Sequence, residues 1–154
     1  MEPIETSALI RIAVVDDNST DIYLLQKVLE KAQLHFVIDH LEDGEEALLF
    51  LLRQGQYLQA PIPDLIILDL NMPRVSGAEV MTRIREDPIL QTIPIIVLTT
   101  SDTLEDKRMM AELGVVLYLT KSSSLKDYFT IGETIKEFLT TRRGFQPPAS
   151  GGDQ

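Results

Sequence analysis

Runs dominated by apolar residues recur along the chain and alternate with segments in which apolar residues return every three or four positions. Runs of about four to eight apolar residues are typical of strands buried on both faces of a sheet. The pattern therefore predicts five strands, at Ile10–Val15, Phe36–His40, Leu65–Leu68, Ile95–Leu98 and Val115–Leu119.

The segments between these runs have a helical period. After Asn18, a residue type favoured as a helix cap, one face of a predicted helix collects Ile22, Leu25, Val28, Leu29 and Ala32. The last segment has the clearest stripe, formed by Tyr128, Ile131, Ile135, Phe138 and Leu139. Strands that alternate with helices predict right-handed crossovers and a parallel sheet covered on both faces. The expected fold class is a doubly wound α/β domain.

The chain of 154 residues is long enough for one domain with a substantial core. We expect this domain to span residues 10–140, after an N-terminal tail of residues 1–9. Residues 141–154 contain Pro147-Pro148 and Gly151-Gly152 and almost nothing apolar, so we expect a disordered C-terminal tail.

The amino-acid composition limits the cellular environment and the kinds of partner expected for this protein. Asp and Glu number 24 against 14 Lys and Arg, with no basic stripe, so direct nucleic-acid binding is not expected. The absence of Cys excludes disulfides and agrees with a reducing compartment. The apolar stretches are too short to cross a membrane, and Met1–Ala8 lacks the basic start of a secretion signal. A cytoplasmic location is expected.

Acidic residues follow two of the predicted strands directly. Asp16 and Asp17 end the first apolar run, and Asp69 ends the third. The carboxyl ends of parallel strands meet in the crevice where open α/β sheets bind ligands. Three carboxylates that meet there repel one another and imply a cation. Oxygen ligands, without any Cys or nearby His, favour Mg²⁺ over Zn²⁺.

Further polar residues follow the other strands that point into the same crevice. Thr99 follows the fourth apolar run, and Lys121 lies just past the fifth. Asp69 can then attack a phosphoryl donor as a carboxylate nucleophile, with Mg²⁺ and Lys121 offsetting charge on the transferred group. Thr99 can donate its hydroxyl to a phosphate oxygen. Asn71 can supply its backbone carbonyl to the metal.

Each of these residues also has an ordinary structural explanation. Asp16 and Asp17 could cap the following helix, because carboxylates are stabilising near a helix N-terminus. Thr99 could be a simple strand-end residue, and Lys121 a solvated charge. The functional interpretation is favoured because these residue types occur together at the ends of successive strands.

With these residues in this order along the sequence, the chain resembles the receiver domains of two-component response regulators. The resemblance covers roughly Ile10 to Leu139 and includes the acidic pair, the stretch Leu68-Asp69-Leu70-Asn71-Met72-Pro73, Gly77, Thr99 and Lys121. It implies a flavodoxin-like sheet of strand order 2-1-3-4-5. It also implies phosphoryl transfer from a sensor histidine kinase to Asp69, in a protein that is not an enzyme but assists its own phosphorylation and dephosphorylation. Tyr118 matches the family's aromatic switch residue, which moves together with Thr99.

Two features depart from the common family pattern. Lys121 is followed by Ser122 in place of proline, so the usual cis peptide at this joint is not favoured intrinsically. The connection of residues 53–63 before the third strand is longer than usual. It resembles stand-alone receivers that partner phytochrome-type histidine kinases, although receivers paired with other sensor or hybrid kinases share these features.

Other protein classes fit the sequence less well. A haloacid-dehalogenase-type phosphatase needs its Asp nucleophile on the first strand and a second Asp two residues later, where this chain has Asn71 after Asp69. A flavodoxin needs a hydroxyl-rich phosphate loop where Asp16 and Asp17 stand. A P-loop nucleotidase needs a Gly-rich lysine loop. A pseudo-receiver would usually lack one of the key groups.

No effector segment follows the predicted domain, so the signal is expected to leave through the surface of the domain itself. Receivers often dimerise through the face formed by the fourth helix, the fifth strand and the fifth helix. We expect a homodimer through this face, with the apolar candidates Leu104, Met109, Val116 and Phe129.

Overall fold

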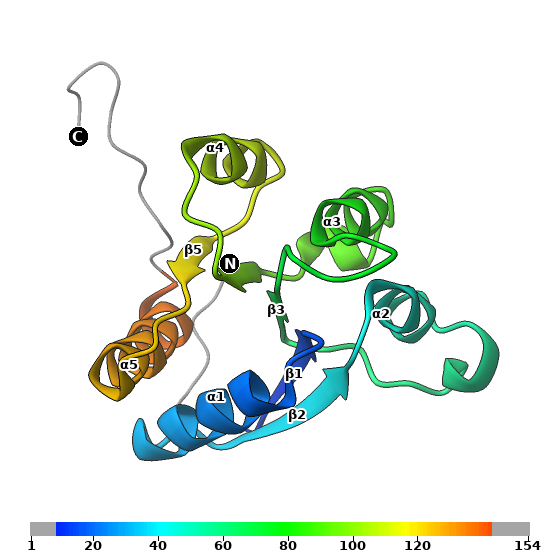
Figure 1. Ribbon diagram of the computed structural model, residues 1–154. Helices are drawn as coiled ribbons and strands as arrows, with labels where there is room; N and C mark the ends of the chain where they lie inside the picture. Colours follow the sequence, from blue (N-terminus) through cyan, green and yellow to red (C-terminus); the bar gives the residue numbers. More distant parts are fainter. Residues whose placement is uncertain (1–8, 143–154) are drawn as a thin grey trace.

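Five parallel strands form the centre of the molecule, as Figure 1 shows for the computed structural model, which describes residues 9–142. The strands are β1 (Ile10–Val15), β2 (Phe36–Leu41), β3 (Leu65–Leu68), β4 (Ile95–Thr99) and β5 (Leu117–Thr120). Their order in the sheet is β2-β1-β3-β4-β5, and every pair is parallel. The flavodoxin-like, doubly wound fold is thereby confirmed. Of the predicted tails, 1–9 and 141–154, residues 1–8 and 143–154 lie outside the described residues.

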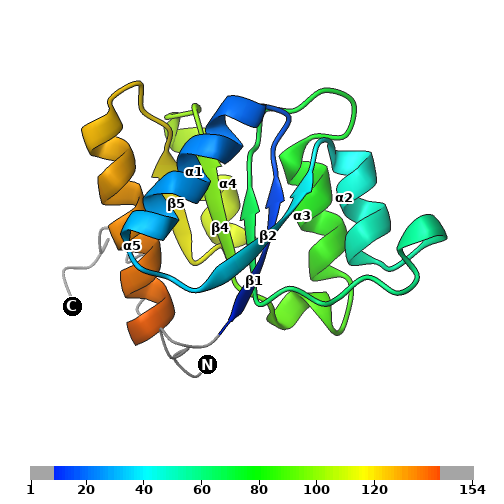
Figure 2. The same cartoon turned by 90° about the horizontal axis from the view of Figure 1, so that it is seen from below.

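The helices cover both faces of the sheet. They are α1 (Ser19–Lys31), α2 (Gly44–Leu51), α3 (Gly77–Arg85), α4 (Leu104–Glu112) and α5 (Leu125–Thr141), with short 3₁₀ turns η1 (Gly55–Tyr57) and η2 (Leu90–Thr92). Figures 1 and 2 show α1 and α5 on one face and α2, α3 and α4 on the other. Each face therefore has its own apolar core.

The alternation of side chains along β1 explains the two cores. Ile12 and Val14 pack with the buried stripes of α1 and α5, whereas Ala13 and Val15 pack with α2 and α3. Successive residues of a strand point to opposite faces, so a strand covered on both sides is apolar throughout. This accounts for the continuous apolar runs in the sequence.

All five α-helices begin in the same way. The side chain of each N-cap residue accepts a hydrogen bond from the backbone N–H three positions later, and that third residue is acidic every time. Negative charge near a helix N-terminus is stabilising. The cap and acid pairs are Asn18 and Asp21, Asp43 and Glu46, Ser76 and Glu79, Thr103 and Asp106, and Ser124 and Asp127.

The structure shifts one predicted strand. β5 begins at Leu117 and not at Val115, because Gly114 has a positive φ of 86° and the N–H of Val115 donates to Met110 in the turn that ends α4. At the other end of the domain, α5 includes Thr141 and is capped by Arg142 in a left-handed conformation. Within residues 9–142, no helix combines the length and apolar character needed to cross a bilayer.

The close packing of α1 against α5 generates a stability prediction. A Cβ added at Gly132 would lie 2.8 Å from the carbonyl oxygen of Val28, an approach that real Cβ atoms do not make. We expect Gly132→Ala to lower the free energy of unfolding by about 1–3 kcal/mol, although alanine favours helix, because the two helices must separate. Urea denaturation tests this, with the exposed neighbour Glu133→Ala as control. A Gly132→Ala variant as stable as the wild type would contradict it.

Candidate functional site

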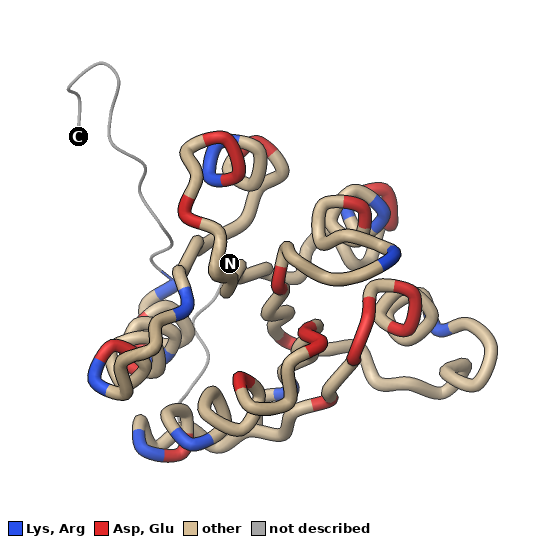
Figure 3. The backbone as a smooth tube through the Cα atoms, viewed as in Figure 1, with Lys and Arg blue, Asp and Glu red and all other residues tan. Residues whose placement is uncertain are grey.

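Three carboxylates meet at the carboxyl ends of β1 and β3. These strands are neighbours, and the N–H of Asp69 donates to the carbonyl of Val15 at 2.9 Å. Asp16, Asp17 and Asp69 each offer an oxygen within 4.8 Å of the others. Figure 3 shows acidic residues gathered around the loops that follow these strands. Asp16 and Asp69 are buried and Asp17 is exposed, so the structure brings the predicted acidic residues together as expected.

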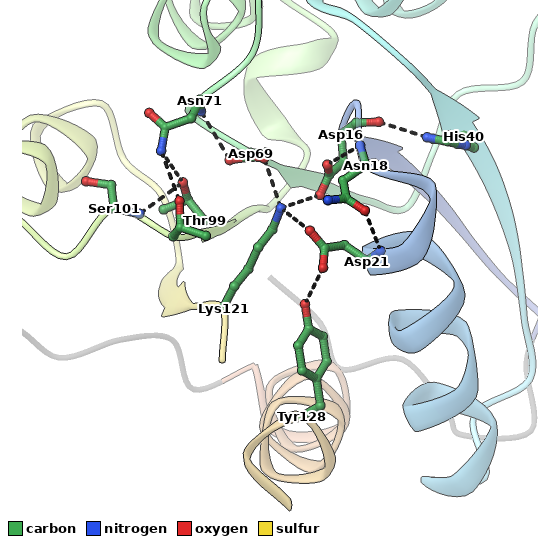
Figure 4. Close-up of polar contacts among 11 residues, drawn as sticks. Asp16, Asn18, Asp21, His40, Asp69, Asn71, Thr99, Ser101, Lys121 and Tyr128 are labelled. Carbon is green, nitrogen blue, oxygen red and sulfur yellow. Dashed lines mark hydrogen bonds and ion pairs between the residues drawn. The ribbon is translucent and has the colours of Figure 1, made fainter. Parts of the chain in front are cut away.

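Lys121 lies at the centre of the site, as Figure 4 shows. Its ammonium nitrogen is 2.9 Å from Asp16 Oδ2 and 3.0 Å from Asp69 Oδ2. A third carboxylate, that of Asp21, is 2.8 Å away, and the lysine side chain is only 7 % exposed. Burial lowers the pKa of Lys121, but hydrogen bonds to the three carboxylates outweigh it and hold the pKa above its ordinary value. Lys121 therefore stays charged at neutral pH.

The buried carboxyl of Asp16 experiences the opposite balance. Burial raises the pKa of Asp16 above its ordinary value, while the hydrogen bonds from Lys121 and from the backbone N–H of Asn18 act to lower it. Its backbone carbonyl is 2.8 Å from His40 Nε2 on β2. Contacts with Lys121, Asn18 and His40 thus hold Asp16 in place, and the positive charge of Lys121 favours its ionised form.

Asp21 is a site residue that sequence reasoning missed. It occupies the third position of α1, where its backbone N–H donates to the Asn18 side chain. Its Oδ2 contacts Lys121, and its Oδ1 accepts a hydrogen bond from the buried Tyr128 hydroxyl at 3.2 Å. An acidic residue at this position is common to all five helices, so its sequence position gives no separate signal.

Asn71 and Thr99 lie on the other side of Asp69. The backbone N–H of Asn71 donates to Asp69 Oδ1 at 3.1 Å, and its side-chain amide donates to Thr99 Oγ1 at 3.4 Å. Thr99 is the buried last residue of β4, and its carbonyl accepts a 2.7 Å hydrogen bond from the backbone N–H of Lys121. The structure therefore places Thr99 and Lys121 side by side, as predicted.

Tyr118 is tied to the loop before α4. Its hydroxyl donates to the carbonyl of Ser101 at 3.0 Å, and the Ser101 hydroxyl in turn hydrogen-bonds to Asp106 of α4. The ring is half-buried, with the Lys107 ammonium 6.0 Å from its centroid. The role of Tyr118 as a switch stays a prediction. Residues 9–142 contain no cis peptide bond, so the joint after Lys121 is trans.

The loop after Asp69 is held against the sheet edge by two close backbone approaches. A Cβ at Gly77 would lie 2.5 Å from the carbonyl oxygen of Asp69, and a Cβ at Gly44 would lie 2.5 Å from the carbonyl oxygen of Val75. Only glycine fits at either position without a shift of the backbone. The two glycines thus fix the path of the chain beside the phosphoacceptor candidate.

The carboxylate cluster fits a hard divalent cation. Among the described residues, the carboxylate of Asp17 has no hydrogen-bond or ion-pair partner, so both of its oxygens are open to a ligand. The Oδ1 atoms of Asp16 and Asp69 accept backbone N–H groups, and their Oδ2 atoms face Lys121. An all-oxygen donor set of this kind suits Mg²⁺.

Comparison with known proteins gives the family. Residues 12–131 match the response regulator receiver domain. Over 127 residues the chain is 42% identical to the response regulator Rcp1 of Synechocystis sp., covering 82% of this chain and 86% of that protein. The chain belongs to the receiver-domain family of response regulators. Its resemblance to that family is thereby confirmed.

Two solved structures are especially similar. The phosphorylated cyanobacterial phytochrome response regulator RcpA superposes with a TM-score of 0.81 at 38% identity, covering 92% of this chain and all of the other. The Mn²⁺-bound form of Rcp1 gives a TM-score of 0.80 at 40% identity, covering 91% and 99% of the two chains. A bacteriophytochrome response regulator, RtBRR, gives 0.71 at 30% identity, covering 94% and 86%.

The exposed position of Asp17 allows the metal site to be tested separately from the fold. We expect Asp17→Ala to leave stability in metal-free buffer nearly unchanged, because the carboxylate has no partner. In the wild type, Mg²⁺ at about a hundred times its dissociation constant should add roughly 2.7 kcal/mol to the free energy of unfolding, and the variant should lose most of this gain. Thermal melting with EDTA or MgCl₂ measures both. An equal Mg²⁺ response in wild type and variant would contradict the metal role.

Proposed function

We propose that this protein is a phosphorylation-controlled signalling domain that accepts a phosphoryl group on Asp69 from the histidine of a sensor kinase. The observation that carries the proposal is the 3.0 Å contact between the carboxylate of Asp69 and the ammonium of Lys121, next to a second buried carboxylate. In the transfer, an oxygen of Asp69 forms a bond to phosphorus as the bond from phosphorus to the donor imidazole nitrogen breaks. The imidazole leaves with the electron pair and takes up a proton.

The surrounding residues stabilise the charge that arrives with the phosphoryl group. Lys121 stays protonated and lies against the accepting carboxylate, and Thr99 offers a hydroxyl donor from the end of β4. Mg²⁺ would offset further negative charge when held by Asp16, Asp17, Asp69 and the backbone carbonyl of Asn71. These groups let the domain assist its own phosphorylation and dephosphorylation, although it is not an enzyme acting on a separate substrate.

We further propose a phytochrome-type histidine kinase as the donor. RcpA is described as a cyanobacterial phytochrome response regulator and RtBRR as a bacteriophytochrome response regulator, and both resemble this chain over most of its length. Another sensor or hybrid kinase is the alternative for the input. A phosphatase of the haloacid-dehalogenase type is disfavoured, because the nucleophile candidate follows β3 and Asn71 stands where the general acid would be needed.

Phosphorylation at Asp69 can be tested with small donors and with a kinase. We expect acetyl phosphate or beryllofluoride with Mg²⁺ to modify the wild type and to leave Asp69→Asn unmodified, because an amide is not a nucleophile here. A phosphorylated phytochrome-type histidine kinase should transfer label to the wild type alone. Phosphate-affinity gels and mass spectrometry measure both reactions.

A matched control lies at the opposite end of the same strand. Asp64 directly precedes β3, and its carboxylate accepts the backbone N–H of Arg11 at 2.8 Å, far from the ammonium of Lys121. Asp64→Asn should therefore be modified like the wild type. Labelling of Asp69→Asn at the wild-type rate would reject Asp69 as the acceptor.

We also propose that the domain signals as a homodimer through the face formed by α4, β5 and α5. Leu104 and Met109 support this, because they are 60 % and 40 % exposed on α4. The other two predicted contact residues, Val116 and Phe129, are less exposed. Both are half-buried against the core, and the ring of Phe129 lies 5.4 Å from the Lys31 ammonium of α1. Leu104 and Met109 are therefore the contacts to test.

Leu104→Asp tests this face with little harm to the monomer. Leu104 is the first residue of α4, where an acidic side chain is favourable to the helix, so the fold should be retained. We expect the variant to weaken self-association about tenfold or more, because the charge would be buried in a twofold contact. Analytical ultracentrifugation with and without beryllofluoride measures this. Leu58→Asp, at a 65 % exposed position beyond η1, is the control. A dimer indifferent to Leu104→Asp would move the interface elsewhere.

A further inference from the structure

The ammonium of Lys121 contacts carboxylates that belong to the candidate cation cluster and one carboxylate that does not. It carries three hydrogens and has three carboxylate partners, at 2.8 to 3.0 Å. Asp16 and Asp69 also belong to the cluster that suits a cation, whereas Asp21 does not. Of the three carboxylates, only that of Asp21 would therefore remain a partner of the lysine alone when a cation is bound.

A cation at the cluster must share the carboxylates of Asp16 and Asp69 with this lysine. In both Asp16 and Asp69, Oδ1 already accepts a backbone N–H and Oδ2 already faces the ammonium. A divalent cation that approaches these carboxylates repels the ammonium and competes with it for their negative charge. The lysine must then weaken its hold on both residues, although its charge is still needed beside Asp69.

We propose that Asp21 is a positioning residue that retains Lys121 at the site while the cation occupies the oxygens of Asp16 and Asp69. The proposal deepens the function proposed above and rests on it. By sharing the ammonium, Asp21 reduces the competition between lysine and cation. It also keeps the ammonium within reach of the accepting carboxylate.

The surroundings of Asp21 suit this role. Its backbone N–H is fixed by the cap residue Asn18, and its Oδ1 is bonded to Tyr128 of α5. The side chain is only 20 % exposed, so its charge is less screened than that of a free surface acid. The close approach of α1 to α5 at Gly132 keeps the two helices in register. Asp21 is thus a carboxylate held in place before any ligand arrives.

The other helices provide the contrast. Each has an acidic residue at the same third position, but among the described residues none of those four contacts Lys121. Glu79 of α3 is exposed, its backbone N–H donates to the cap Ser76, and its side chain has no hydrogen-bond or ion-pair partner within residues 9–142. A charge removed at Glu79 therefore tests the helix end alone, and a charge removed at Asp21 tests the helix end together with the lysine.

The test measures Mg²⁺ affinity of the full chain by isothermal titration calorimetry. We expect Asp21→Asn to bind Mg²⁺ about threefold to tenfold more weakly, because the ammonium then rests on Asp16 and Asp69 alone. Lys121→Met should bind Mg²⁺ more tightly than the wild type, because a competing positive charge is gone. Glu79→Gln should change the affinity by less than about twofold.

The double variant distinguishes positioning from simple charge attraction. If Asp21 acts through the lysine, Asp21→Asn should have less than about a twofold effect in the Lys121→Met background. An equal loss in both backgrounds, or no loss in either, would overturn the proposal. Asp21→Glu, which keeps the charge, should recover most of the affinity, and melting curves identify any variant that has not folded. If the wild type itself bound no Mg²⁺, the proposed function would fail and not this inference alone.

Discussion

The attraction between one buried ammonium and the carboxylates around it is the constraint on which the site depends. Within residues 9–142, Lys121 is the only Lys or Arg whose side chain contacts the carboxylates of Asp16, Asp21 and Asp69, and it reaches them from the end of β5, across the sheet from β1. Buried carboxylates without a partner would protonate or destabilise the fold. The sheet order matters for this reason, because it brings the ends of β1, β3 and β5 to one edge. Fold and chemistry are thus coupled through a single side chain.

Much of this arrangement could be predicted because strand ends are easy to find in a sequence. A buried parallel strand is apolar throughout, so Asp16, Asp69 and Thr99 stand out where the apolar run stops. The parallel sheet then dictates that these residues share an edge. Lys121 could be predicted in the same way, from its position just past the fifth apolar run. Its carboxylate partner on α1, Asp21, could not.

The features that were missed depend on how helices pack, which a periodic pattern does not specify. The acidic residue at the third position of α1 has the same sequence context as four others, and only the closeness of α1 to β5 and α5 makes Asp21 different. The stripe on α5 likewise shows which residues are buried, but not that Phe129 faces α1. Val115 reads as a strand residue, yet the glycine before it keeps it in the turn that ends α4.

The two loops that follow β3 and β4 are held in different ways. The chain after β3 is pressed against backbone at Gly77 and Gly44, so it has no room to move without displacing main-chain atoms. The chain after β4 is held by hydrogen bonds of side chains: the 3.4 Å contacts of Thr99 with Asn71 and Ser101, the 3.0 Å bond from Tyr118 to the Ser101 carbonyl, and the bond between Ser101 and Asp106. A shift at Asp69 would therefore displace main-chain atoms on the β3 side, whereas rotations of side chains would accommodate it on the β4 side. The two neighbouring loops thus differ in what holds them: main-chain packing after β3 and side-chain hydrogen bonds after β4.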